Sequence, residues 1–303
     1  KAAEILISNG VAKPILLGSK EKMEAIIEEY QLELQEAEFI DIMADRDGRE
    51  RYATQMYEFR KRRGWTMGEC RSKIKSREYY GNMMLRDGGA DALISGLTVK
   101  YPTALRPILR IIGMEEGMRK AAGMYILLSK RGPMFFADTT INLDPTVEDL
   151  VQMVLNVADT VKRTNIVPKV ALLSYSNFGS SNGPDAHKMA KASAILRKEH
   201  PDLIVDGEMQ ANFALEPELL QESFPFSDLV GHQANVFIFP NLAAGNITYK
   251  MLQSFGAAEA IGPMLIGTKH SAHVLQLGAS VREIVNMATL AAVDARNRKV
   301  KKA

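Results

Sequence analysis

The chain has 303 residues, of which 46% are hydrophobic and 24% charged. This composition excludes a disordered protein and suits about two globular domains. No uninterrupted apolar stretch approaches the roughly 20 residues of a membrane helix, and the single cysteine, Cys70, excludes an internal disulfide bond and is typical of a cytoplasmic protein. Lys and Arg total 38 against 36 Asp and Glu, a net charge of +2. Such a balance gives no general attraction to nucleic acid or membranes, so we expect neither as a partner.

The N-terminal residues indicate a helix and a piece of a longer protein. The chain begins at Lys1, continues into the helix-like run 2–7, and has neither an initiator methionine nor a signal segment. A whole protein trimmed of its tag would look the same. Of the two interpretations, we favour a domain cut from a longer polypeptide.

Short apolar runs separated by amphipathic stretches predict an α/β fold. Most of these runs are continuous rather than alternating, which is typical of strands buried on both faces of a mainly parallel sheet. The predicted strands are 14–17, 92–94, 124–128, 134–137, 170–173, 203–205, 236–239 and 264–266.

Two helices have recognisable starts. Asp144 followed by Pro145 predicts an N-cap and a first helical residue, and apolar residues then recur on one face from Leu150 to Val161. Ser280 and Glu283 predict a capping box at the start of the last helix.

A basic run, residues 60–63, precedes the only tryptophan, Trp65. Basic residues beside an aromatic side chain could bind phosphate or nucleic acid, but we favour a solvated helical face. His270 and His273 are the only close pair of histidines, and we expect hydrogen bonds from them rather than a metal site.

Three polar loops follow predicted strands, where ligands gather in open α/β sheets. The clearest, 174–185, is rich in serine, asparagine and glycine and leads into a helix, which predicts a cradle of neutral donors for a phosphate or carboxylate. In the second loop Asn246 is expected to be an N-cap, and its amide could also face a ligand. The third carries Lys100 and Arg106, which could neutralise phosphate or could equally be exposed charges.

The order of these motifs resembles the phosphate acetyl/butyryl transferase family over nearly the whole chain. The matching stretches are 10–18, 90–96, 137–138, 142–146, 173–176, 201–210, 234–240, 245–250 and 259–264. The resemblance implies an isocitrate/isopropylmalate-dehydrogenase-like fold with two three-layer αβα subdomains, residues 1–128 plus 270–303 and residues 129–269. It also implies an acyl-CoA and phosphate site in the cleft between them, and a homodimer or higher oligomer.

The chain departs from active family members at the residues that assist acyl transfer. Their late motif reads Asn-Asp-Leu-Ser-Arg-Gly, whereas here Gln276 stands at the serine position and Leu277 at the arginine position. Glu283 occupies a nearby acidic position as a remnant acid or base, and Ser254 replaces a further arginine. The resemblance and the loops together predict an acyl-CoA and phosphate site, without metal, at Ser174, Ser176, Asn177, Gly179, Ser180, Asn246, Gln276, Gly278, Lys100, Arg106 and Lys269.

These departures, with residues 58–65 and 77–85, are similar to the C-terminal domain of large hybrid malic enzymes. The resemblance implies a domain that has lost catalysis, binds acetyl-CoA as an effector, and regulates and oligomerises an N-terminal malic-enzyme part. NADP and a divalent metal are expected only in that part, and no cofactor in this chain. The alternatives are an active phosphate acetyl- or butyryltransferase and a purely architectural dimerisation domain.

Overall fold

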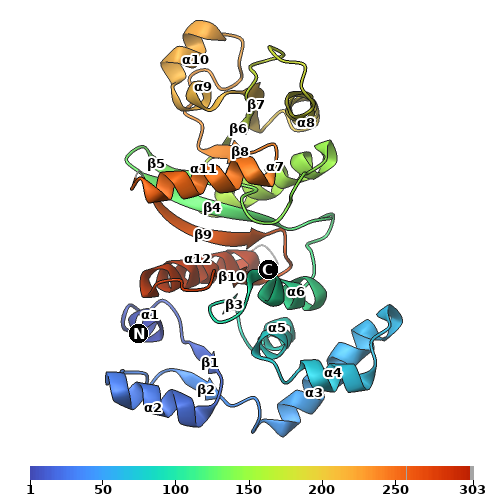
Figure 1. Ribbon diagram of the computed structural model, residues 1–303, viewed down its shortest axis with the longest axis vertical. Coiled ribbons are helices and arrows are strands. Elements are labelled where there is room, and N and C mark those ends of the chain that lie inside the picture. The colour runs from blue at the N-terminus through green and yellow to red at the C-terminus, as the bar shows by residue number, and fades with distance from the viewer. Residues whose placement is uncertain (257, 301–303) are drawn as a thin grey trace. The chain divides into compact units, whose positions relative to one another are not determined.

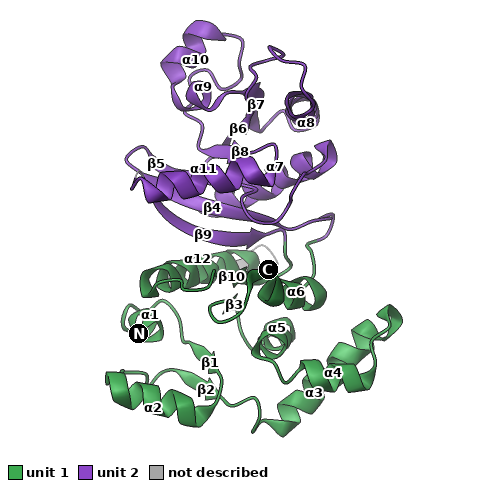
Figure 2. Cartoon of the chain, viewed as in Figure 1, with its two compact units in different colours: residues 1–115, 268–303 green, residues 116–267 purple. Residues whose placement is uncertain are grey.

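The computed structural model describes residues 1–256 and 258–300, and it divides the chain into two compact units (Figure 2). Unit 1 comprises residues 1–115 and 268–303, and unit 2 comprises residues 116–267. Residues 116–128, which the sequence analysis assigns to the first subdomain, therefore belong to unit 2. Both units combine strands with helices, as expected for an α/β protein.

Unit 1 contains two short parallel sheets with helices packed around them (Figure 1). β1 (Ile15–Leu17) pairs with β2 (Glu38–Ile40), and β10 (Ser271–Val274) pairs with β3 (Ala92–Ser95). The helices are α1 (Ala2–Ser8), α2 (Lys20–Tyr30), α3 (Arg46–Arg60), the 3₁₀ turn η1 (Lys61–Arg63), α4 (Met67–Lys73), α5 (Arg77–Asp87), α6 (Tyr101–Ile111) and α12 (Val281–Val300).

Unit 2 is built on one six-stranded sheet in the order β7-β6-β8-β5-β4-β9. The strands are β4 (Ala122–Ser129), β5 (Gly132–Ala137), β6 (Lys169–Leu173), β7 (Ile204–Met209), β8 (Val236–Ile238) and β9 (Glu259–Ile266). The helices are α7 (Val147–Lys162), α8 (Pro184–Glu199), α9 (Ala211–Leu215), α10 (Pro217–Ser223) and α11 (Leu242–Ser254). β7, β6, β8 and β5 run parallel, whereas β4 is antiparallel to both β5 and β9.

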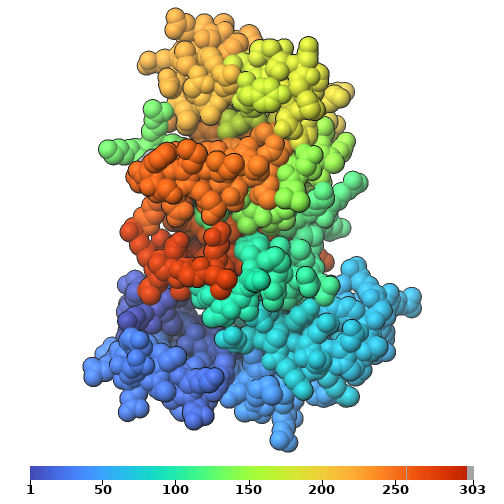
Figure 3. Space-filling model, viewed as in Figure 1, coloured from blue at the N-terminus to red at the C-terminus, as the bar shows by residue number. Residues whose placement is uncertain are grey.

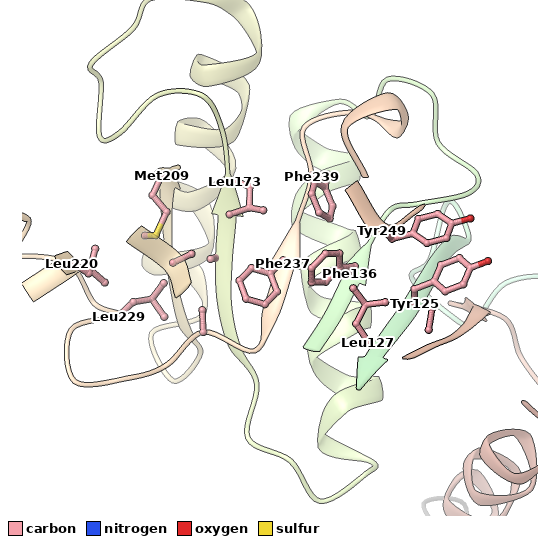
Figure 4. Packing of buried hydrophobic residues seen from close by; sticks show 14 residues of the cluster. Tyr125, Leu127, Phe136, Leu173, Met209, Leu220, Leu229, Phe237, Phe239 and Tyr249 are labelled. Carbon is pink, nitrogen blue, oxygen red and sulfur yellow. The ribbon is translucent and has the colours of Figure 1, made fainter. Parts of the chain in front are cut away.

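Aromatic side chains fill one side of the unit 2 core (Figure 4). Tyr125 stacks on Tyr249 with ring centroids 4.0 Å apart, and Phe136 packs against both Phe237 and Phe239. These rings come from β4, β5, β8, the residue directly after β8 and α11, so their burial holds the helix against the sheet. Aromatic contacts of this kind add to the stabilisation from the buried apolar area.

The predicted strands are present and most of them pair in parallel, as expected. The sheet of unit 2 is nevertheless mixed, because β4 is antiparallel to both of its neighbours. The predicted apolar face of α7 is confirmed, since Leu150 and Val161 are fully buried. Its N-cap is Thr146 rather than Asp144, and Thr146 and Asp149 form a capping box. Among the described helices, none has both the length and the apolar character needed to cross a bilayer.

Candidate functional site

The loop that follows β6 is organised by a buried carboxylate. The Ser176 hydroxyl and the Gly179 N–H both donate to Glu208 Oε1, at 2.9 and 2.7 Å. Ser176 is fully buried, and Glu208, which lies on β7, is 2% exposed. These two donors were expected to be open to an anion, but the protein's own carboxylate accepts from them. Their contribution to the structure is therefore to hold the loop.

The other predicted residues of this loop bond mainly to one another. Ser174 Oγ accepts from the Ser176 N–H at 3.2 Å, and Ser180 Oγ accepts from the Asn177 N–H at 2.9 Å. Asn177 Oδ1 accepts from the N–H of Gln210 at 2.8 Å. The loop is thus tied to its own turn and to the end of β7, and a contact with ligand stays a prediction.

Asn246 lies at the same edge of the unit 2 sheet, beside the loop after β5. It stands inside α11 and is not the N-cap; that position belongs to Asn241, whose Oδ1 accepts from the Ala244 N–H at 3.0 Å. Asn246 Nδ2 donates to Thr139 O at 3.0 Å. Because β5, β6 and β8 are parallel neighbours, the loops after them meet at one edge, so the structure brings Asn246 to the edge that carries the 174–180 loop.

A second polar edge belongs to unit 1, where the loops after β3 and β10 adjoin. Leu275 N–H donates to Ser95 O at 2.8 Å. Gly96 has a φ of +105°, and a Cβ there would lie 2.2 Å from Leu275 O, so only glycine allows this approach. Lys100 is the N-cap residue of α6 and makes no side-chain capping bond. The loops that carry Lys100, Gln276 and Gly278 therefore leave the same edge of this two-stranded sheet. Arg106 is exposed further along α6.

Lys269 is not at this edge. It precedes β10, and its N–H donates to Gly113 O at 3.1 Å. Gln276 follows the opposite end of the same strand, whose four residues span about 13 Å. The prediction grouped both residues in one site, and within unit 1 they lie at opposite ends of β10.

Glu283 takes part in the predicted capping box, which is confirmed. The Ser280 N–H donates to Glu283 Oε2 at 2.7 Å, and the Glu283 N–H donates to Ser280 Oγ at 3.2 Å. The carboxylate therefore has a structural role at the start of α12. Leu277, at the position where active relatives were expected to carry arginine, is 58% exposed.

A buried guanidinium, missed by the sequence analysis, lies at the end of α3. Arg60 is only 8% exposed, and its Nε has no hydrogen-bond partner. Burial, and after it the positive charges of Arg63 and Arg110, lower the pKa of Arg60 from its ordinary value. The sequence contains a signal for this burial, because Arg60 stands one helical turn after the fully buried Met56.

Two further cationic side chains lie, like Arg60, close to the ring of Trp65. The cationic groups of Arg60, Lys73 and Arg110 lie 5.6, 5.2 and 5.7 Å from its ring centroid. In the part of the chain that the structure describes, none of these three forms an ion pair with a carboxylate. We call these four residues the Trp65 cluster. The favoured interpretation of residues 60–63 as a solvated face does not hold for Arg60.

Hydrogen bonds connect the Trp65 cluster to the β3 edge. Arg110 Nη1 donates to the Tyr79 hydroxyl at 3.4 Å, and Arg77, on the same helix as Tyr79, donates to Thr98 Oγ1 at 3.3 Å. Thr98 lies in the loop that ends at Lys100. Unit 1 therefore carries positive charge from this loop to Trp65, a pattern suited to an elongated anion.

Metal ligands and cavities were two further indications of a ligand site, and neither coincides with the two polar edges. Among the described residues no group of three His, Cys, Asp or Glu side chains could hold a metal ion. A cavity of about 490 Å³ in unit 2 is bounded by residues 117–122, the first half of α7 and the end of α8, and it contains none of the predicted site residues.

Comparison with known proteins gives one consistent result. Residues 1–292 match the family described as phosphate acetyl/butaryl transferase. The chain is 39% identical to "NADP-dependent malic enzyme" of Salmonella typhimurium over 97% of this chain and 39% of the relative, so it spans well under half the length of that protein. It is 34% identical to "Phosphate acetyltransferase" of Clostridium acetobutylicum, over 97% of this chain and 90% of the relative. The crystal structure of a phosphotransacetylase from Streptococcus pyogenes is 33% identical and superposes with a TM-score of 0.88, covering 97% of this chain and 89% of that one.

Proposed function

This chain belongs to the phosphate acetyl/butyryl transferase family, and from this premise we propose that it is an acetyl-CoA-binding domain without transferase activity that regulates an attached NADP-dependent malic enzyme. The observation that carries the binding part is the buried Arg60 guanidinium, which has no acidic partner in the described protein. An isopropylmalate-dehydrogenase-like arrangement of two α/β domains and a cytoplasmic location stay part of this proposal.

The charges of unit 1 suit the phosphate groups of CoA. Coenzyme A carries a diphosphate and a 3′-phosphate, and arginine binds such groups through two parallel N–H donors. Arg60 and Arg110 could supply these donors, and α6 begins beside Lys100 without a side-chain cap to offset the partial positive charge of the helix end. A bound phosphate would supply the negative charge that Arg60 lacks, and this gives the site a physical reason to bind CoA.

The residues at the thioester end support the loss of catalysis. Acyl transfer to phosphate needs a base for the CoA thiol and positive charge near the reacting carbonyl. Leu277 supplies no charge, and the Glu283 carboxylate accepts from the N–H of Ser280. An arginine at a phosphoryl-transfer site can contribute about 10³–10⁵ in rate, so its replacement by leucine favours a very slow reaction.

The regulatory role rests on the malic-enzyme relatives. The chain matches only 39% of the length of three proteins named NADP-dependent malic enzyme. Oxidative decarboxylation of malate to pyruvate, with NADP and a divalent metal, would then belong to a part outside this chain. Acetyl-CoA could affect that part only if it binds one conformation of the protein more tightly than another.

Calorimetry together with an activity assay tests the proposal. We expect acetyl-CoA to bind with micromolar affinity, while acetyl phosphate plus CoA gives no turnover above about 1 s⁻¹, the low end of typical enzymes. An absence of binding heat up to about 1 mM acetyl-CoA, a concentration at which only very weak binding would go undetected, contradicts the binding function. Binding with faster turnover instead supports the second candidate described next.

An active phosphate acetyl- or butyryltransferase is the second candidate, favoured by the likeness to phosphate acetyltransferases of 34% identity. It would use Glu283 as base and Lys100 or Arg106 to hold phosphate. Lys269, the third cation considered for this role, precedes β10 and so lies at the end of that strand opposite to Gln276. Formation of acetyl-CoA from acetyl phosphate at an ordinary enzymatic rate decides for this candidate.

An apolar stripe on α11 favours pairing of two copies, which is the architectural part of the proposed function. Ile247, Met251 and Phe255 recur every four residues and are 58%, 50% and 75% exposed. In Figure 3 the orange surface of α11 is uncovered on the viewed face. Exposed apolar residues grouped in this way mark interaction surfaces.

Charge placed on this stripe should separate the copies. We expect Met251→Glu to convert a dimer into a monomer in light scattering, because a carboxylate in an apolar interface would lose its hydration without a partner. Gln253→Glu is the matched control, since Gln253 is exposed on the same helix but off the stripe. If Met251→Glu stays dimeric, α11 is not the interface.

A further inference from the structure

We propose that Arg298 is a clamp that fixes both segments through which the chain passes between its two units, and that α12 thereby controls how freely the units move. The inference does not depend on the proposed function, because of the predicted ligand-site residues it uses only Lys269, and of that residue only the backbone. It concerns residues 113–117, residues 267–269 and the last turns of α12.

The two passages lie side by side on the unit 1 side. The chain leaves unit 1 after Glu115 and returns at Thr268. Met114 forms a β-bridge with Thr268, and the Lys269 N–H donates to Gly113 O at 3.1 Å. The two segments therefore form a short two-stranded connection and not two independent linkers.

Glycines with left-handed backbone conformations bracket both passages. Gly113 and Gly117 have φ of 74° and 79°, and Gly267 has φ of 83°. Around Gly113 and Gly117 a Cβ would meet no atom within 4 Å, so close packing does not explain the glycines, whereas their φ values do. Residues with such backbone freedom at element ends are where hinge motions concentrate.

One guanidinium joins both passages to α12. Arg298 Nη1 pairs with the carboxylate of Glu115 and also donates to Thr268 O at 2.8 Å. Arg298 Nε donates to Asp294 Oδ2 at 2.7 Å, one turn back on the same helix. The side chains of Arg298, Asp294 and Glu115 are 13%, 7% and 29% exposed. The bond between Arg298 and Asp294 is thus largely shielded from water, where charge-assisted hydrogen bonds are strongest, and the pair with Glu115 is partly shielded.

The geometry gives α12 a direct mechanical link to the connection between the units. While Arg298 holds Glu115 and Thr268, bending can begin only beyond these residues, at Gly117 and Gly267. When the clamp is released, Met114 and Lys269 can also move. The unclamped protein should therefore visit a wider range of arrangements of the two units.

Hydrogen–deuterium exchange of the full chain tests the clamp locally. In Arg298→Met we expect the amides of residues 113–117 and 268–269 to exchange about tenfold faster, because loss of a charge-assisted bond lowers the cost of local opening. The amides of β6, in the core of unit 2, should not change. Arg197→Met is the matched control, since Arg197 also pairs with two carboxylates, Asp206 and Asp228, but within unit 2.

Single-molecule energy transfer tests the consequence for the units. Dyes are attached at Glu21→Cys in unit 1 and Glu218→Cys in unit 2, both exposed, while Cys70 is buried and stays unlabelled. The distance distribution should broaden in Arg298→Met and stay unchanged in Arg197→Met. If Arg298→Met does not fold, Glu115→Gln, which keeps the bond to Asp294, decides the question. Unchanged exchange and an unchanged distribution in the folded variant overturn the proposal.

Discussion

Replacing Arg60 with methionine is expected to weaken acetyl-CoA binding about 10- to 100-fold without lowering the thermal stability of the protein. The loss of affinity follows from removing a charge-assisted contact with phosphate, which contributes roughly 1.5–3 kcal/mol. Isothermal titration calorimetry measures the first effect, and a melting curve without ligand measures the second.

The unchanged stability follows from the surroundings of Arg60. Its charge is buried and stands beside other guanidinium groups, and its Nε has no partner. Such a group costs free energy in the unliganded protein, so an apolar side chain of similar length relieves that cost. A residue that opposes folding yet strengthens binding is typical of a functional site.

A neighbouring arginine provides the control for this experiment. Arg62 lies two residues further along the chain, in the adjoining turn η1, but is exposed. Arg62→Met removes the same charge and should change acetyl-CoA affinity by less than about threefold, the range of a screened surface charge. Equal losses in both variants would indicate general attraction rather than a specific contact, and retention of full affinity in Arg60→Met would contradict the assignment.

Apolar runs were sufficient to predict most strands and their mainly parallel pairing, but they indicated neither the reversed direction of β4 nor strands that contain polar residues. The runs 170–173 and 236–239 became β6 and β8 because their side chains are buried. β10 was not predicted, because Ser271 and His273 read as polar. In the structure Ser271 Oγ contacts His273 Nε2 at 3.0 Å and donates to Ala291 O at 3.1 Å, so its polar atoms are satisfied inside unit 1.

At the candidate site, too, contacts between residues close in sequence could be predicted, whereas contacts between distant residues could not. The capping box of Ser280 and Glu283 depends on residues three positions apart, and it was predicted correctly. The partner of Ser176 is Glu208, 32 residues away, and no local pattern indicates that this carboxylate would use the donors of the loop. Arg60 was missed for a related reason, since a basic run is ordinarily exposed and only the position of Arg60 after Met56 indicates burial.

A second large effect concerns acid stability, which we expect His273 to dominate. Its ring is 1% exposed, and burial lowers the pKa of His273 to about 4 from its ordinary 6.5. Asp294 and Arg298 face it with opposite effects on the pKa, raising and lowering it respectively. Between pH 6.5 and 4 the unfolded chain therefore binds a proton on this residue that the folded protein does not.

The sign and size of the effect follow from this difference in proton binding. The free energy of unfolding should fall by about 1.4 kcal/mol for each pH unit below 6.5, or roughly 3 kcal/mol by pH 4, and this loss is absent above pH 6.5. Urea unfolding at pH 7, 6 and 5 measures it. His273→Gln should flatten this part of the pH dependence, whereas His187→Gln, at an exposed position on α8, should retain it. An unaltered slope in His273→Gln would mean that other groups cause the acid sensitivity.

Because Asp294 and Arg298 also form the proposed clamp, protonation of His273 would place a positive charge beside Arg298. Acid should therefore loosen the last turns of α12 before the rest of unit 1.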